Sequence, residues 1–259
     1  MGSILWSAQI GAVIAVLALP DRGHPAPKPK DKAEVLGAIT AEQLAESAKN
    51  LEQIALAFHN YHDTYGQLPI NQLSKDKKPL LSWRVQILAF IERAGPLAPP
   101  GTPPVIEHEH LFKAFKLDEP WDSEHNRKLI DKMPRLYAPV RGKADPGLTF
   151  YQALGGLNRW LRPGARLAAS FPDGTSNTFL VAEAARPVVW TKPDDLAYDG
   201  KNVPVLGGMF EGKFHAAMAD GSVSRFRKTI DADVLKLQID PADGKVLPAD
   251  FGIDPEKTK

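Results

Sequence analysis

The stretch Asn50–Pro69, NLEQIALAFHNYHDTYGQLP, decides the fold of this chain, because it predicts one long amphipathic helix followed by a turn. Its apolar and aromatic residues recur every three or four positions, as on one face of a helix: Leu51, Ile54, Ala55, Phe58, Tyr61, His62 and Tyr65. Thr40 and Gln43 match the capping box that starts a helix, and Gly66 stops it. We therefore expect a helix of about 25 residues, roughly 37 Å long, that begins near Ala41.

Shorter helices are expected after this one, and strands after them. The expected helices are Leu80–Ala94, Leu111–Phe115 and Glu124–Lys132, the last capped by Asp122 or Ser123, with an exposed loop at Pro96–Pro104. The expected strands are Leu148–Ala153, Thr178–Glu183, Val188–Trp190, Met209–Phe210 with Phe214–Met218, and Val223–Phe226. Asp220-Gly221 lies between two apolar runs, which is a strong hairpin signal.

Helix first and strands afterwards is the pattern of an α+β fold, in which an antiparallel β-sheet packs on the apolar face of the long N-terminal helix. The chain has 259 residues, of which 43% are hydrophobic, enough to form one sizeable core. We expect a single domain over residues 40–240. Residues 241–259 show little periodicity and are expected to be a C-terminal tail that frays.

The N-terminal residues predict export. Residues 4–19, ILWSAQIGAVIAVLAL, are almost entirely apolar. This run of 16 residues is shorter than the roughly 20 needed to span a membrane comfortably, but its length is typical of a secretory signal. We expect a signal peptide or membrane anchor at 1–19 and a Pro/Lys-rich linker at 20–39. The protein would then be periplasmic or associated with the cell envelope, and would touch the membrane only through this segment. An N-terminal helix within the core is the alternative.

Composition excludes several classes of function. Lysine and arginine number 32 against 31 acidic residues, for a net charge of +1, and no basic run occurs, so nucleic acid is not an expected partner. The absence of cysteine excludes disulfides, cysteine-ligated zinc and iron–sulfur clusters. No nucleotide-binding loop or nucleophile motif is present, and Glu183, within an apolar run, is expected to be a buried polar anchor. We expect a protein that is not an enzyme.

Two groups of residues invite a metal site. Asp173, Ser176 and Asn177 offer short oxygen ligands for calcium, provided that a distant Asp194, Asp195 or Asp199 converges on them. The same three residues are equally suited to capping turns through the backbone. His59 and His62, with Asp63, lack the second carboxylate-bearing partner of a zinc site, so we expect their rings to pack at the helix end and bond loop carbonyls. No other cofactor is expected.

Two tryptophans are candidates for binding a sugar. Trp121 and Trp190 lie beside turns and acidic residues, where an exposed ring can stack on a sugar face. Packing in the core is the alternative for each.

Several blocks resemble a large planctomycete family, the domain of unknown function numbered 1559, some members of which are labelled as solute-binding. They are the long helix, Leu81–Glu92, Leu111–Ile130, Phe171–Ala184, Trp190–Asp199 and His215–Phe226, in the family's order. The positions that match the family's motifs are His59, Asn60, Tyr61, His62, Asp63, Asp173, Gly174, Asp220 and Gly221. The resemblance implies a fold like that of pilins and pseudopilins, with helical and loop insertions.

The chain departs from this family in two respects. Many members begin with a prepilin leader and a long apolar helix, which are not found here, so the resemblance is to the members that are not prepilins. The family's C-terminal signature is His, nine residues, then Asp-Gly, and Phe210 occupies the histidine position before Asp220. A role for that histidine therefore cannot be transferred.

These observations predict a non-catalytic exported domain that acts in protein–protein interaction or assembly at the cell envelope. The alternative is an extracytoplasmic binding module for a small ligand, a sugar or calcium. Assembly predicts an exposed apolar stripe along the long helix at Leu36, Ile39, Leu44 and Ala48, whereas a binding module predicts a pocket near Trp121 or Trp190. Neither the partner nor the oligomeric state follows from the sequence.

Overall fold

The long helix α1 spans Ala41–Tyr65, as predicted, in a computed structural model that describes residues 38–92, 106, 108–142, 145–156 and 160–254. The Thr40 side chain accepts a hydrogen bond from the Gln43 amide, and the Gln43 side chain bonds back to the Thr40 amide, which completes the capping box. Gly66 ends the helix in the left-handed conformation (φ 67°), where glycine has no steric penalty.

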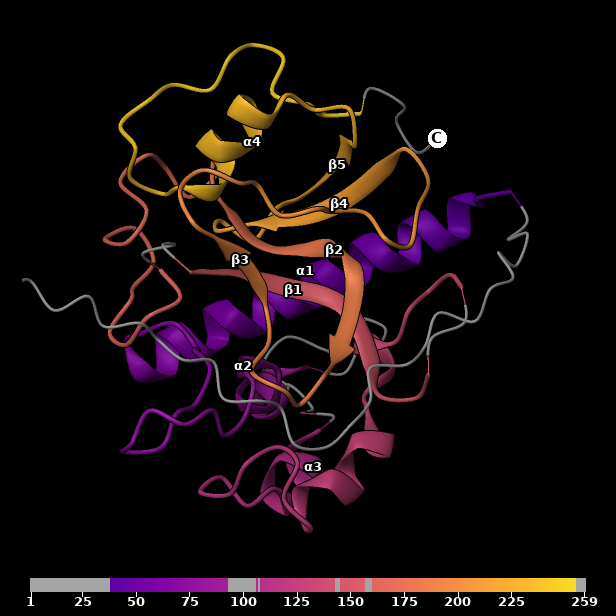
Figure 1. Cartoon of the computed structure of the whole chain (residues 1–259), viewed down its shortest axis with the longest axis vertical. Coiled ribbons are helices and arrows are strands. Elements are labelled where there is room, and N and C mark those ends of the chain that lie inside the picture. The colour runs from indigo at the N-terminus through magenta and orange to yellow at the C-terminus, as the bar shows by residue number, and fades with distance from the viewer. Residues whose placement is uncertain (1–37, 93–105, 107, 143–144, 157–159, 255–259) are drawn as a thin grey trace, which may run out of the picture. The chain divides into compact units, whose positions relative to one another are not determined.

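A five-stranded sheet packs against α1, which confirms the α+β class. Its strands are β1 (Leu148–Gly156), β2 (Phe179–Val189), β3 (Leu196–Tyr198), β4 (Lys213–Met218) and β5 (Val223–Arg227), in the order β3-β1-β2-β4-β5. Figure 1 shows α1 crossing the sheet, and α1 contacts β2, β4 and β5. All strand pairs are antiparallel except β1 with β3, so the sheet is mixed rather than purely antiparallel.

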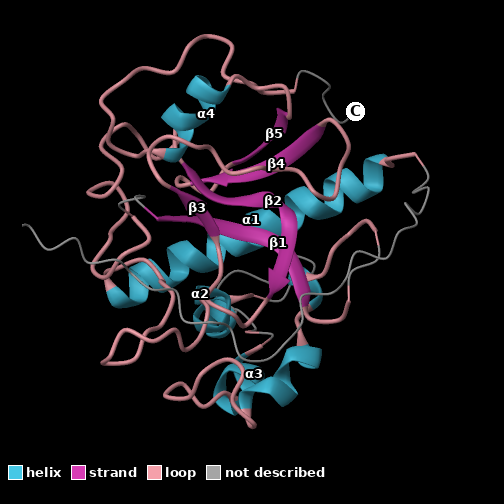
Figure 2. Cartoon of the chain, in the orientation of Figure 1, coloured by secondary structure: helices cyan, strands magenta, loops and turns pink. Residues whose placement is uncertain are grey.

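Between α1 and β1 the chain forms only short helices, set in long loops (Figure 2). They are α2 (Trp83–Gln86), η1 (Ile87–Phe90), α3 (Glu109–Ala114), η2 (Asn126–Lys132) and η3 (Arg135–Tyr137). The helix expected at Leu80–Ala94 is shorter than predicted, and its second half, η1, is a 3-10 helix. The helix expected at Glu124–Lys132 is the 3-10 helix η2, and Ser123 Oγ accepts a hydrogen bond from the Asn126 amide (3.1 Å).

Residues 241–244 and 251–254, which follow β5, bond or pack against the rest of the domain, so the expectation of a frayed tail from residue 241 was wrong for these residues. The helix α4 (Ala232–Ile239), which the sequence patterns did not predict, precedes this segment. Ile253 forms a β-bridge with Phe226, and Phe251 packs on the same apolar cluster as α4. Long-range contacts of this kind have no periodic signature in the sequence.

The sheet has an apolar cluster on each side. The larger one joins α1 and the short helices to the sheet, and its members include Leu51, Phe58, Trp83, Trp160 and Trp190. The smaller one joins the sheet to α4, with Phe179, Phe214, Phe226 and Ile239 among its members. All the described residues lie within one compact unit, Gly37–Lys259.

The predicted export segment, residues 1–19, and nearly all of the predicted linker, 20–39, lie outside the described residues, as does the Pro-rich loop at Pro96–Pro104. Among the helices that the structure describes, none has the length and apolarity needed to cross a bilayer.

Candidate functional site

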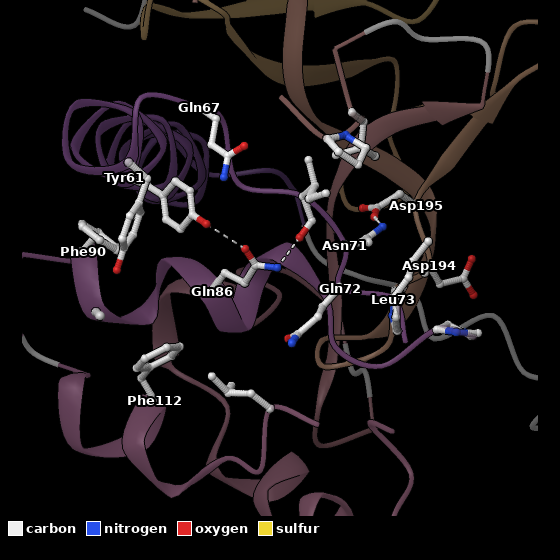
Figure 3. Close-up of a pocket in the computed structure, with 18 of the residues that line it drawn as sticks. Tyr61, Gln67, Asn71, Gln72, Leu73, Gln86, Phe90, Phe112, Asp194 and Asp195 are labelled. Atoms are coloured by element: carbon white, nitrogen blue, oxygen red, sulfur yellow. Dashed lines mark hydrogen bonds between the residues drawn. The ribbon is translucent and has the colours of Figure 1, made fainter. Parts of the chain in front are cut away.

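A cavity of about 820 Å³ lies between the C-terminal end of α1 and the start of β3, and we call it the aromatic pocket (Figure 3). Its walls come from Tyr61 and Tyr65 of α1, the segment 67–73, η1, α3 and the segment 193–197. These segments are far apart in sequence and meet only because α1 and the sheet bring them together. A volume of a few hundred to about 1,000 Å³ is typical of ligand pockets.

Three rings in mutual contact form one wall of this pocket. The ring centroids of Tyr61 and Tyr65 are 4.6 Å apart, and that of Phe90 lies 5.3 Å from Tyr61 and 5.7 Å from Tyr65. Tyr61 and Tyr65 share a helix face because they are four residues apart. Burial, and then the neighbouring Tyr65, raise the pKa of Tyr61, whereas Tyr65 is 58% exposed. The three side chains therefore form a continuous aromatic wall.

Four carboxamide side chains line the pocket, and two of them are engaged by the protein itself. Gln86 accepts a hydrogen bond from the Tyr61 hydroxyl (3.2 Å) and donates to the Ile70 carbonyl (2.5 Å), as Figure 3 shows. Asn71 accepts a hydrogen bond from the Trp83 amide (3.0 Å) and donates to Asp195 (2.8 Å). These four hydrogen bonds fix the positions of both side chains.

The other two carboxamides belong to Gln67 and Gln72. Figure 3 shows both extending into the space between the aromatic wall and the segment that leads into β3. Gln67 is exposed and Gln72 is half-buried. Each offers both donors and an acceptor to a bound molecule.

A buried ion pair supports the opposite wall. Nη2 of Arg84 lies 2.7 Å from Oδ1 of Asp195, and the side chains are 0% and 4% exposed. The same oxygen accepts hydrogen bonds from the indole of Trp83 (3.0 Å) and the amide of Ala153 (3.0 Å). Asp195 thus joins α2, β1 and the start of β3 at this wall of the pocket.

The pocket has no net formal charge available to a ligand. None of the described residues that line it is Lys, Arg or His. Its two carboxylates are each paired with a basic group, Asp195 with Arg84 and Asp194 with Lys192 (3.0 Å). Neither an anion nor a cation would find an uncompensated partner here.

The two tryptophans proposed for sugar stacking do not line this pocket. Trp190 is fully buried, stacks on Tyr137 with centroids 5.8 Å apart, and donates its indole hydrogen bond to the Ile130 carbonyl (2.8 Å). It has no face to offer a ligand, so its candidacy was wrong. Trp121 is half-buried, with Lys192 Nζ lying over its ring at 5.9 Å. The same Lys192 pairs with Asp194, which lines the pocket.

The candidate calcium ligands do not converge on one point: Asp173 and Asn177 bond to the backbone and Ser176 is exposed. Both carboxylate oxygens of Asp173 lie 3.1 Å from the Gly244 amide, and Asn177 donates to the Asp173 carbonyl (2.8 Å). Ser176 is exposed. Asp194 and Asp195 are paired elsewhere, and Asp199 bonds the backbone of its own turn (2.8 Å to the Lys201 amide). Within the described part of the chain, no three His, Asp or Glu side chains are placed to hold a metal ion.

Of the positions that match the family's motifs, His59 joins α1 to the residue that precedes the β4–β5 turn. His59 Nε2 lies 3.1 Å from the Ala219 carbonyl, as expected of a packed histidine. His62 Nδ1 lies 3.5 Å from Asp63, and Asn60 donates to Glu92 (2.9 Å). Asp220 accepts from Ser222 within the turn, Gly221 adopts φ 90° there, and Gly174 adopts φ 106° in the turn after Asp173. Of these positions, only Tyr61 lines the pocket.

A buried polar cluster that the sequence only hinted at lies between α1 and the sheet. Glu183, 0% exposed, accepts hydrogen bonds from Ser47 Oγ, from His215 Nδ1 (3.0 Å) and from the His215 amide (2.9 Å). The Ser47 proton is directed to Glu183, so the Tyr151 hydroxyl donates to Ser47 (2.8 Å). Glu183 is therefore the buried polar anchor that was predicted. The ring of Phe210 packs edge-on against that of His215, with the ring centroids 5.7 Å apart.

A model of the family described as a protein of unknown function, DUF1559, matches residues 45–97, which confirms the resemblance over this segment. The segment contains most of α1, α2 and η1, and thereby the aromatic wall and all four pocket carboxamides. No curated protein and no solved structure shows significant similarity to the chain.

Proposed function

We propose that this chain is a non-catalytic binding module, exported from the cytoplasm, whose aromatic pocket binds an uncharged organic ligand. The observation that carries the proposal is the pocket itself, in which a continuous aromatic wall faces two carboxamides with free donors and acceptors. A largely apolar concavity with a few polar groups that fix orientation is typical of ligand sites. The balanced charge of the walls favours a neutral ligand.

A binding role is better supported than assembly through the long helix. Assembly predicted an exposed apolar stripe on this helix, but Leu44 is only 9% exposed and Ile39 packs against the core. Ala48 is half-buried, and Leu36 lies outside the described residues. The pilin-like assembly role therefore has no exposed apolar stripe to support it at the described positions, whereas the pocket supports a binding module.

A non-catalytic role is supported by the residue types in the pocket. The described lining residues include no Ser, Thr, Cys, His or Lys that could serve as a nucleophile. The two carboxylates that line it are paired with cations rather than with each other. We propose that the pocket holds its ligand by stacking and hydrogen bonding alone.

Export is supported by the apolar residues 4–19 and the Pro/Lys-rich residues that follow. Fractionation of cells that express the full chain, with N-terminal sequencing of the recovered protein, tests it. We expect recovery from the envelope or the periplasm. Recovery of the full-length chain from the cytoplasm would contradict export and leave the pocket proposal standing.

A ligand screen tests the binding proposal directly. The full chain is screened by ligand-observed NMR against neutral saccharides, neutral peptides and other uncharged metabolites. Tyr65→Ala should weaken a true pocket ligand at least tenfold, because it removes the most exposed ring of the wall. Leu56→Ala is the matched control, since Leu56 is an exposed residue of α1 (48%) outside the pocket. Failure of every compound to bind, or binding that Tyr65→Ala does not weaken, would overturn the proposal.

A further inference from the structure

We infer that the ligand of the aromatic pocket is an uncharged, extended peptide segment of a partner protein with an apolar side chain, rather than a sugar. This inference rests on the proposed binding function and names the class of ligand. Three features of the pocket carry it, namely its exposed leucines, its carboxamides and edge strand, and its balanced charge.

The exposed leucines at the rim are the first feature. The described residues include seven large hydrophobic side chains that are exposed, and three of them line this one pocket: Tyr65 (58%), Leu73 (53%) and Leu117 (37%). Exposed apolar residues gathered at one concave site mark an interaction surface. A sugar presents hydroxyl groups around most of its surface. If it covered these leucines, its hydroxyl groups would lose their hydrogen bonds to water and gain none from the leucines in return. An aliphatic or aromatic peptide side chain gains free energy from the same contact.

The carboxamides and the edge strand are the second feature. The side-chain amides of Gln67 and Gln72 carry the same kinds of donor and acceptor as a peptide bond, so each can pair with an extended backbone in the pocket. On the opposite wall, β3 is an edge strand of the sheet, and its exposed Ala197 lines the pocket. Edge strands are a common docking place for extended peptides, because their outer backbone groups have no partner strand.

Charge is the third feature. The pairing of Asp194 with Lys192 and of Asp195 with Arg84 leaves no free charge for an acidic or basic peptide. The rings of Tyr61, Tyr65 and Phe90 contact one another at 4.6–5.7 Å, so they do not surround an open cage for a cationic group. The segment bound in the pocket is therefore uncharged.

Selection of peptides from a random library tests the inference. Linear heptapeptides displayed on phage are selected on the full chain, and the selected sequences are synthesised and titrated by calorimetry. We expect selected peptides to be uncharged at their central positions and to carry an aliphatic or aromatic residue there. Leu73→Ser should weaken them about tenfold, and Gln72→Glu should weaken them too, because it adds an uncompensated charge.

Leu56→Ser is the matched control, because it also removes an exposed leucine but lies outside the pocket, and it should leave the affinity unchanged. Leu117→Ser repeats the test at a second rim position. Selected peptides that bind the Leu73 and Leu117 variants as tightly as the parent chain would overturn the inference. A saccharide that binds in a manner dependent on Tyr65, with no peptide selected, would overturn the inference but leave the proposed function intact. The absence of any peptide, saccharide or other uncharged ligand would overturn both.

Discussion

The carboxylate of Asp195 lies 2.7 Å from the guanidinium of Arg84, with both side chains almost fully buried, although the two residues are 111 positions apart in the chain. This pair joins α2 to the segment that enters β3, where Asp195 lines the aromatic pocket. The carboxylate also accepts hydrogen bonds from Asn71, Trp83 and Ala153. Removal of one partner from such a pair leaves a buried charge without compensation.

Asp195→Ala should therefore lower the free energy of unfolding by about 3–5 kcal/mol. The adjacent Asp194→Ala is the matched control, because the pair of Asp194 with Lys192 is about half-exposed and such pairs contribute at most about 1 kcal/mol. Denaturant titration followed by circular dichroism measures both. Equal effects of the two substitutions would show that the buried pair does not stabilise the fold as the geometry indicates.

The hydrogen bond from Ser47 to Glu183 should stabilise the packing of α1 on the sheet. Ser47→Ala removes a donor to a buried carboxylate and should cost about 1.5–3 kcal/mol. Thr64→Ala is the control on the same helix, because its hydroxyl bonds the Asn60 carbonyl at the exposed surface, and it should change stability by less than about 0.5 kcal/mol. Chemical denaturation provides the comparison, and a neutral Ser47→Ala would contradict the role assigned to Glu183.

Gly252→Ala tests whether residues 241–254 pack against the domain in solution. Gly252 has φ 90°, and a Cβ there would lie 2.5 Å from the Ile230 side chain. The left-handed backbone should cost about 1–2 kcal/mol and the overpacking about 1–3 kcal/mol more. Gly244→Ala has a similar backbone (φ 71°) but no neighbour within 4 Å, so only the first cost applies. Thermal unfolding of the two variants would give equal results if this segment were frayed.

Alkaline pH should destabilise the protein through its buried tyrosines. Burial raises the pKa of Tyr137 and Tyr151 above the ordinary value of 10.0, and both side chains are 0% exposed. A raised pKa in the folded state contributes stability that is fully present below pH 10 and is lost as the pH rises toward the folded-state value. We expect the near-ultraviolet absorbance of these phenolates to rise only together with unfolding. Ionisation of all five tyrosines before any loss of circular dichroism would contradict this expectation.

Acidic pH should act at the turn after β3. Hydrogen bonds from the Asn202 amide, the Lys201 amide and the Asn202 side chain lower the pKa of Asp199 from 3.8 to about 2. A lowered pKa contributes stability that is present above pH 3.8 and is lost as the pH falls toward 2. NMR titration of the Asp199 carboxyl should give the lowered pKa. Asn202→Ala should raise the pKa of Asp199 part of the way toward 3.8, because it removes the side-chain hydrogen bond. An ordinary value near 3.8 in the parent chain would show that the turn is not held in this conformation.

Local patterns in the sequence predicted the parts of the fold that depend on neighbouring residues. Helix α1 followed from its apolar period and its capping residues, and the β4–β5 hairpin followed from Asp220-Gly221 between apolar runs. Strand β3 was not predicted, because three residues give no recognisable period and their parallel pairing with β1 joins distant segments. The ordered C-terminal segment was missed for the same reason, since Ile253 pairs with Phe226 across 27 residues.

The candidate site shows the same division. The sequence by itself determined that Tyr61 and Tyr65 share one face near the end of α1, because a helix places residues four apart side by side. Only the tertiary structure decided that Phe90 contacts these rings, that Gln72 and Asp194 line the same pocket, and that Trp190 is buried. The physical reason is that helix geometry acts between near neighbours, whereas a pocket depends on which distant segments pack together to bury apolar surface.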